Sequence, residues 1–82
     1  MQSVENQIRS RMNAFTATER NVAEYILKNT DVVYESITAV AENCQASYGT
    51  IVRFYQKLGY SGFKDFKIHL ALERDINPSV QM

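Results

Sequence analysis

Apolar residues recur every three or four positions along most of the chain, and strict alternation of apolar and polar residues does not occur. A period near 3.6 residues gathers side chains on one face of an α-helix, so the pattern predicts helices rather than strands. The first predicted helix runs from about Val4 to Ala14, with Ser3 as its N-cap. Its apolar stripe comprises Val4, Ile8, Met12 and Phe15.

The second predicted helix begins at the motif TATE, where Thr16 and Glu19 have the spacing of a capping box. Val22, Tyr25, Ile26 and Asn29 follow at the i, i+3, i+4 and i+7 positions of one helical face, and the turn-forming run NTD predicts the end of the helix. The third predicted helix is short and follows Ser36, which we expect to be its N-cap. Its apolar face comprises Ile37, Val40, Ala41 and Cys44.

The fourth predicted helix starts after Ser47 and stops at Gly59, a residue suited to the left-handed conformation that ends many helices. Its inner face comprises Ile51, Phe54, Tyr55 and Leu58. The fifth opens at YSGF, and Pro78 prevents a long continuation. One side of it carries Phe63, Phe66 and Leu70, and the other carries Ile68, Leu72 and Ile76. A helix that is apolar on two faces is expected to have two neighbours.

The third and fourth predicted helices are separated by only the residues QAS. Two short helices joined by so tight a turn are typical of a helix-turn-helix, whose second helix lies in the DNA major groove. Aromatic side chains cluster from Ala46 to Lys67, and we expect them to anchor the fourth helix from behind. The predicted fold is therefore an all-α, five-helix bundle that contains a homeodomain-like helix-turn-helix and no wing.

The outer side of the fourth predicted helix carries residue types that suit DNA. A glycine permits close approach, hydroxyl groups suit phosphate, and an arginine fork can pair with guanine. No acid interrupts this set, and the positive end of the helix dipole also favours phosphate. The candidate DNA-binding residues are Ser47, Tyr48, Gly49, Thr50, Arg53, Gln56, Lys57 and Lys64.

Each candidate also has a structural interpretation. Ser47 and Thr50 can simply start the helix, and capping is the expected main role of Ser47. Tyr48 can instead be a partly buried ring, and Arg53 can form a surface salt bridge with Glu42 or another acid. Solvated side chains are the alternative for Gln56, Lys57 and Lys64.

Composition narrows the choice of partner and of chemistry. The 82 residues have no net charge, but the segment from Asn43 to Lys64 has three cations and no acid, so a polyanion could bind only through one patch. A single Cys44 fits a reducing, cytoplasmic setting, and no apolar run is long enough to span a bilayer. With one histidine, His69, one cysteine and no Gly-rich phosphate loop, we expect no enzyme activity, no metal and no cofactor.

Three segments together resemble the N-terminal DNA-binding domain of the RpiR family of bacterial transcription regulators. They are FTATERNVAEYIL, SITAVAENCQAS and TIVRFYQKLGYSGFKDFK, and the resemblance covers about residues 12–74. The run VRFYQKLGYSGFKDFK is its most specific part. Three departures stand out: Gln45 replaces a frequent Gly or Asn of the turn, Ala46 a common Val, and Ala39 a common Glu.

The resemblance implies a DNA-binding domain over residues 1–76 and a loose tail, or the start of a linker, over residues 77–82. Family members join this domain to a C-terminal sugar-isomerase-like domain that senses phosphorylated sugars. They regulate carbohydrate-metabolism genes, as repressors or activators, and act as dimers or larger oligomers. The implied partners are therefore double-stranded DNA and a second copy, with a phosphosugar effector bound only by the absent domain.

A protein-interaction or dimerisation module with an incidental basic patch is the alternative function. Its basis is the second apolar stripe of the fifth predicted helix, which comprises Ile68, Leu72 and Ile76. This stripe can cover the domain's own core or meet a second subunit, and we favour the subunit because DNA readers of this kind usually work in pairs.

Overall fold

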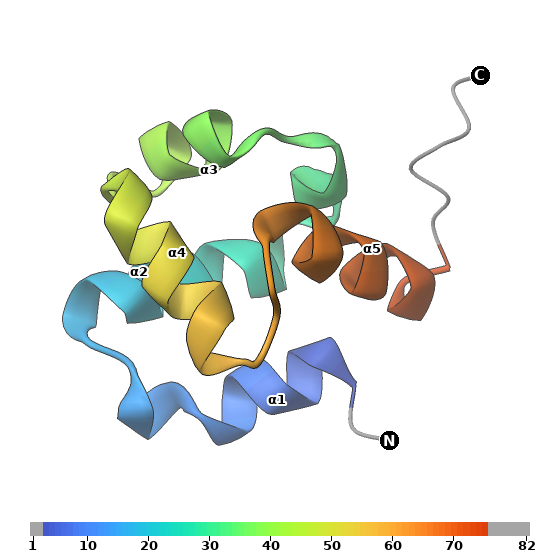
Figure 1. The fold of residues 1–82 in the computed structure, drawn as a ribbon, viewed down its shortest axis with the longest axis horizontal. Coiled ribbons are helices and arrows are strands. Elements are labelled where there is room, and N and C mark those ends of the chain that lie inside the picture. The colour runs from blue at the N-terminus through green and yellow to red at the C-terminus, as the bar shows by residue number, and fades with distance from the viewer. Residues whose placement is uncertain (1–2, 76–82) are drawn as a thin grey trace.

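Helices make up the regular structure of the described part of the protein, residues 3–75 of a computed structural model (Figure 1). No strand occurs within these residues, which confirms the predicted all-α fold. The α-helices are α1 Val4–Ser10, α2 Ala17–Lys28, α3 Ile37–Asn43, α4 Tyr48–Lys57 and α5 Phe63–Glu73. Two short 3-10 helices, η1 Met12–Ala14 and η2 Thr30–Tyr34, precede α2 and α3.

The first four α-helices begin where their capping residues predict. The side-chain oxygens of Ser3, Thr16, Ser36 and Ser47 each accept a hydrogen bond from the backbone N–H three residues further on. Each such cap stabilises its helix by about 1 kcal/mol. The capping box at the start of α2 is complete, because Glu19 also accepts the backbone N–H of Thr16 at 3.0 Å.

The expectation of one continuous helix over Val4–Ala14 is wrong. Helix α1 ends at Ser10, and the chain tightens into η1 after Arg11. This change of path carries Phe15 into the core, where its ring lies 5.1 Å from the ring of Phe54. The second 3-10 helix, η2, was not predicted, and it buries Val32 and Val33.

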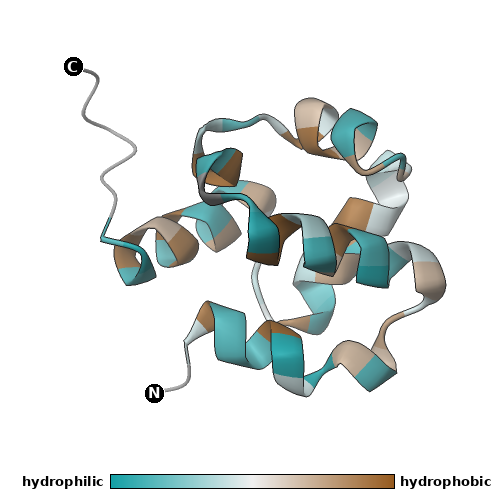
Figure 2. Cartoon of the chain, turned by 180° about the vertical axis from the view of Figure 1, so that it is seen from behind, coloured by the Kyte–Doolittle hydropathy of each residue, from teal (hydrophilic) through white to brown (hydrophobic). Residues whose placement is uncertain are grey.

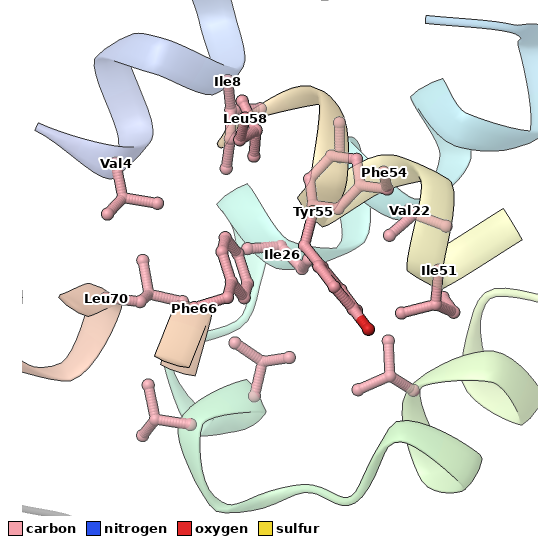
Figure 3. Packing of buried hydrophobic residues seen from close by; sticks show 14 of the residues in the cluster. Val4, Ile8, Val22, Ile26, Ile51, Phe54, Tyr55, Leu58, Phe66 and Leu70 are labelled. Atoms are coloured by element: carbon pink, nitrogen blue, oxygen red, sulfur yellow. The ribbon is translucent and has the colours of Figure 1, made fainter. Parts of the chain in front are cut away.

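One hydrophobic core joins α1, α2, α4 and α5 (Figure 3). The predicted inner face of α4 is confirmed, since Ile51, Phe54, Tyr55 and Leu58 are all buried. The edge of the Phe54 ring meets Phe66 of α5, with ring centroids 5.8 Å apart. Seen from behind, the helices alternate hydrophobic and hydrophilic segments along their length, as expected when each helix buries one face (Figure 2).

Both helices of the helix-turn-helix end in a left-handed residue. Gln45 has φ 54° after α3, and Gly59 has φ 92° after α4. In each case two backbone N–H groups satisfy the last carbonyls of the helix; after α3, the Ala46 N–H donates to Ala41 at 2.9 Å. The predicted stop at Gly59 is thus confirmed, and the left-handed turn forms even with Gln45, at a cost of about 1 kcal/mol relative to glycine.

The C-terminal end of α5 is hydrogen-bonded to the start of α1 and to the end of α2. Arg74 donates to the carbonyl oxygens of Ile26 at 2.7 Å and Asn29 at 2.9 Å, at the C-terminal end of α2, where helical carbonyls lack their regular partners. The Glu73 carboxylate accepts the backbone N–H groups of Val4 and Glu5 at the start of α1. Helix α5 therefore fixes α1 and α2 on the side of the core away from the turn.

A buried carboxylate joins α2 to α4. The Glu19 side chain is 1% exposed, and its Oε1 accepts a hydrogen bond from Lys57 Nζ at 2.6 Å. Burial by itself would raise the pKa of Glu19. The hydrogen bonds from Lys57 and from the Thr16 N–H, with the charges of Lys57 and Arg53, outweigh burial and lower the pKa below its ordinary value.

We predict that this carboxylate makes stability depend on pH. Because the folded-state pKa of Glu19 is lowered, its contribution is present above the unfolded pKa of about 4.3 and is lost as the pH falls through the folded value. Glu19→Gln should lower the free energy of unfolding by about 1–3 kcal/mol at pH 7. The gap from wild type should shrink by pH 3, measured by urea unfolding.

Glu24→Gln is the matched control, since Glu24 is exposed on the same helix. It should stay within about 0.5 kcal/mol of wild type at both pH values. A gap between Glu19→Gln and wild type that is the same at pH 7 and pH 3 would contradict the assignment of an ionised Glu19.

Candidate DNA-binding surface

Helix α4 lies across α2 and next to α3, with its N-terminal end close to the turn after α3 (Figure 1). The face turned to α2 and α3 is mainly apolar, and Tyr48 and Gln56 are exposed on the opposite face. Arg53 and Lys57 are also exposed, but they lie at the side of α4 that borders Glu19 of α2. None of the residues of α4 is acidic. This helix is the second of the helix-turn-helix, the one that enters the major groove in proteins of this architecture.

The start of α4 combines a cap with an exposed ring. Ser47 is exposed and accepts the N–H of Thr50 at 3.1 Å, so its predicted capping role is confirmed. Tyr48 is 62% exposed, which agrees with an outward ring and not with a ring buried on α3. Gly49 is half-buried, and a Cβ there would lie 3.5 Å from Arg53 Nη1, an ordinary contact. Crowding within the protein therefore does not require glycine at this position.

The expected outward position of Thr50 is wrong. Thr50 is only 4% exposed, and its Oγ1 lies 2.8 Å from Ser47 Oγ. The helical period explains the error, because Thr50 lies four residues before Phe54 and one before Ile51, on the buried side of α4. Its hydroxyl serves the start of the helix and its neighbours.

Arg53 is held on one side and open on the other. Its side chain is 61% exposed, and its Nε lies 3.6 Å from Glu19 Oε2. Its Nη2 donates a long hydrogen bond to Thr50 Oγ1 at 3.4 Å. A salt bridge with an acid was the structural alternative for this residue; Glu19, not Glu42, provides the acid. The exposed remainder of the guanidinium is free to meet a ligand.

Lys57 is not the free cation that was expected. Its Nζ lies 2.6 Å from Glu19 Oε1 and donates to the carbonyl oxygen of Ala14 at 3.1 Å. Its side chain is 37% exposed. Lys57 thus fastens α4 to the start of α2, and a contact with phosphate would have to come from a side chain already committed to these bonds.

Among the remaining cations, Lys64 and Lys67 differ. Lys64 is exposed on the first turn of α5 and has no ion pair within residues 3–75. Lys67 is half-buried, donates to the backbone oxygen of Glu35 at 2.7 Å and lies 5.0 Å from the centre of the Phe63 ring. Burial lowers the pKa of Lys67, although the charge of Glu35 partly offsets it. Gln56 is exposed on α4 and stays a candidate for DNA contact.

The second apolar stripe of α5 lies at the surface. Ile68 is 42% exposed and Leu72 is 71% exposed, while Ile76 falls outside the described residues. Leu72 borders an open groove of about 770 Å³ whose walls also include Tyr60 and His69. This stripe and the exposed side of α4 belong to different helices.

Residues 3–75 contain no group of three potential metal ligands, and no helix among them is long and apolar enough to cross a bilayer. The Cys44 thiol donates to the carbonyl oxygen of Val40, and burial raises its pKa. His69 is exposed; its Nδ1 lies near Asp65, four residues earlier, and its ring centroid is 5.3 Å from that of Tyr60.

Sequence reasoning identified Glu19 only as part of a capping box. Its ion pairs with Lys57 and Arg53 join positions 38 and 34 residues apart, so no local pattern reveals them. A hint was available nonetheless: the run from Asn43 to Lys64 has cations but no acid. A partly buried cation in this run, such as Lys57, can therefore pair only with a carboxylate from another part of the chain.

Comparison with known proteins agrees with this geometry. The sequence pattern of the "Helix-turn-helix domain, rpiR family" matches residues 2–76. The HTH-type transcriptional regulator HexR of Escherichia coli is 39% identical over 66 residues, which are 79% of this chain and 23% of that protein. The bifunctional protein glk of Paraburkholderia xenovorans is 34% identical over 70 residues, or 84% of this chain and 11% of that protein.

A solved structure shows the same fold. The Vibrio vulnificus NanR protein complexed with ManNAc-6P superimposes with a TM-score of 0.83 at 40% identity, over 87% of this chain and 27% of that one. The chain spans 21–25% of the length of the first curated relatives that it matches. With its turn, its second helix and this match over nearly the whole chain, the protein belongs to the RpiR family and is its helix-turn-helix DNA-binding domain.

Proposed function

We propose that α4 reads a specific duplex sequence through the major groove, with Arg53 as the principal base-reading residue. The observation that carries this proposal is the exposed Arg53 guanidinium on the outer face of a helix that has no acid. Tyr48 and Gln56 flank it, and the N–H groups of Tyr48 and Gly49 at the start of α4 favour phosphate. Ser47 adds a phosphate contact from the cap position.

We further propose that residues 1–76 act as the DNA-binding domain of a longer regulator, with a linker beginning at residues 77–82. The small share of each relative that the chain covers supports this, and so does the sugar phosphate bound to NanR. On this proposal a C-terminal domain binds a phosphosugar, and the regulator controls carbohydrate-metabolism genes as a cytoplasmic homodimer. This domain itself performs no catalysis, since the regulator relatives share the helix-turn-helix region.

A protein-interaction module is the second candidate, favoured by the exposure of Leu72. A gel shift with random genomic fragments separates the two functions. Sequence-dependent shifting that persists at moderate salt supports DNA reading. If no fragment shifts at any salt concentration while the protein still binds a partner protein, the module reading is correct and the DNA proposal fails.

Arg53→Ala tests base reading. It should weaken binding to the preferred duplex by roughly 1–3 kcal/mol and relax the preference at one base pair of each half-site. The measurement is selection of bound sequences from a random duplex pool, with wild type and variant in parallel. Gln7→Ala on α1 is a suitable control, since it should leave every preference intact. Identical preferences for Arg53→Ala and wild type would show that another residue reads DNA.

Lys64→Gln tests a phosphate contact. Since Lys64 is exposed and has no ion pair within residues 3–75, its loss should barely change stability. It should weaken all duplex sequences alike and reduce the slope of log K against log salt by about one. Lys28→Gln, at the end of α2, is the matched control and should leave the slope unchanged. An unchanged slope for Lys64→Gln would remove this residue from the interface.

A further inference from the structure

The two oxygens of the Glu19 carboxylate have different surroundings. Oε1 accepts hydrogen bonds from Lys57 Nζ at 2.6 Å and from the Thr16 N–H at 3.0 Å. Oε2 is buried and accepts no hydrogen bond within the described residues. The cation nearest to Oε2 is Arg53, whose Nε lies 3.6 Å away. One oxygen thus serves the fold, and the other is directed at a residue of the exposed surface.

Helix capping does not account for this second oxygen. A capping box needs only one side-chain acceptor at the position of Glu19, and glutamine serves there as well as glutamate. Leaving a buried carboxylate oxygen without a hydrogen bond is destabilising. The lowered pKa keeps the group ionised at neutral pH. An ionised Oε2 under α4 therefore calls for a role beyond the start of α2.

The shape of the guanidinium group indicates that role. Arginine presents five N–H groups in a rigid plane, with Nε and one side of Nη2 on one edge and Nη1 with the other side of Nη2 on the end. The first edge faces the protein, because Nε meets Glu19 and Nη2 donates to Thr50 Oγ1 at 3.4 Å. The Thr50 hydroxyl is itself fixed by Ser47 at 2.8 Å. The Arg53 side chain is 61% exposed, and its Nη1 makes no hydrogen bond within the described residues, so this end can pair with guanine O6 and N7.

We propose that Glu19 is a positioning residue for DNA recognition, whose buried Oε2 holds the Nε edge of Arg53 so that the Nη1–Nη2 end meets a base pair. This inference rests on the proposed role of Arg53. Glu19 does not touch DNA; it acts through Arg53. A long side chain loses conformational entropy when it is immobilised at an interface. If Arg53 is already ordered in the free protein, this loss is avoided on binding, which corresponds to roughly a 2- to 12-fold gain in discrimination between base pairs.

A ratio of affinities isolates this effect. The complete polypeptide that carries this chain is titrated with its selected duplex and with duplexes changed at single base pairs, and each ratio cancels any change in folded fraction or overall charge. Arg53→Ala should reduce one ratio by roughly 5- to 150-fold. Glu19→Gln should reduce the same ratio by roughly 2- to 12-fold and leave the others unchanged. In the Arg53→Ala background, Glu19→Gln should have no further effect.

Each other outcome has a defined meaning. If Arg53→Ala changes one ratio and Glu19→Gln changes none, the positioning role is wrong and the proposed function stands. If Glu19→Gln lowers all ratios together, or acts equally in the Arg53→Ala background, Glu19 acts through the placement of α4, and the proposal is again overturned. If Arg53→Ala changes no ratio, base reading by Arg53 fails, and with it the proposal. Glu24→Gln, which removes the same charge from an exposed site of α2, should match wild type.

A second measurement needs neither a variant nor DNA. In the free protein, the Arg53 Nε–H should exchange with water more slowly than that of Arg20, which is exposed on the same helix as Glu19. Nitrogen-15 NMR of the arginine side chains near neutral pH measures both rates. Slower exchange at Arg53 supports the contact with Glu19. Equal rates overturn the proposal, whatever the stability of Glu19→Gln.

Discussion

A single buried charge fixes the orientation of α4, the second helix of the helix-turn-helix. Glu19 lies at the start of α2, directly beneath α4, and its carboxylate binds Lys57 through one oxygen and faces Arg53 with the other. Apolar contacts alone, such as those of Phe54 with Phe15 and Phe66, would set the distance of α4 from the core. The ion pairs also resist rotation of α4 about its own axis, because they engage two side chains one turn apart. The orientation of the exposed face of α4 thus depends on a residue of another helix.

The contacts that hold α4 in the fold therefore also orient its exposed polar side. The capping box that begins α2 supplies the carboxylate that holds α4, so a local motif also serves a tertiary contact. The left-handed residue Gln45 ends α3, the Ser47 cap starts α4, and the left-handed residue Gly59 ends α4. At the C-terminal end of α5, Arg74 binds the end of α2 and Glu73 binds the start of α1. Outward exposure of Arg53 follows from these constraints together.

The sequence predicted what depends on local patterns and missed what depends on distant contacts. Capping residues and the 3.6-residue period were sufficient for the starts of four helices and for the inner face of α4. The break after Ser10 was missed because the apolar stripe continues through Phe15, although the path of the chain changes. Thr50 was misplaced because a polar type was taken as outward, whereas its helical position is inward. Lys57 was taken as free because its carboxylate partner lies far away in the sequence.

The central claim is that the exposed side of α4 is the surface that meets DNA. Titration of the nitrogen-15-labelled protein with its selected duplex, followed by backbone NMR, tests it most directly. The account predicts that the largest changes in backbone chemical shift fall within residues 47–57. The protein concentration is kept at one domain per half-site, and Ile68 and Leu72 should then keep their shifts. Changes centred on Ile68 and Leu72, with α4 unperturbed, would contradict it.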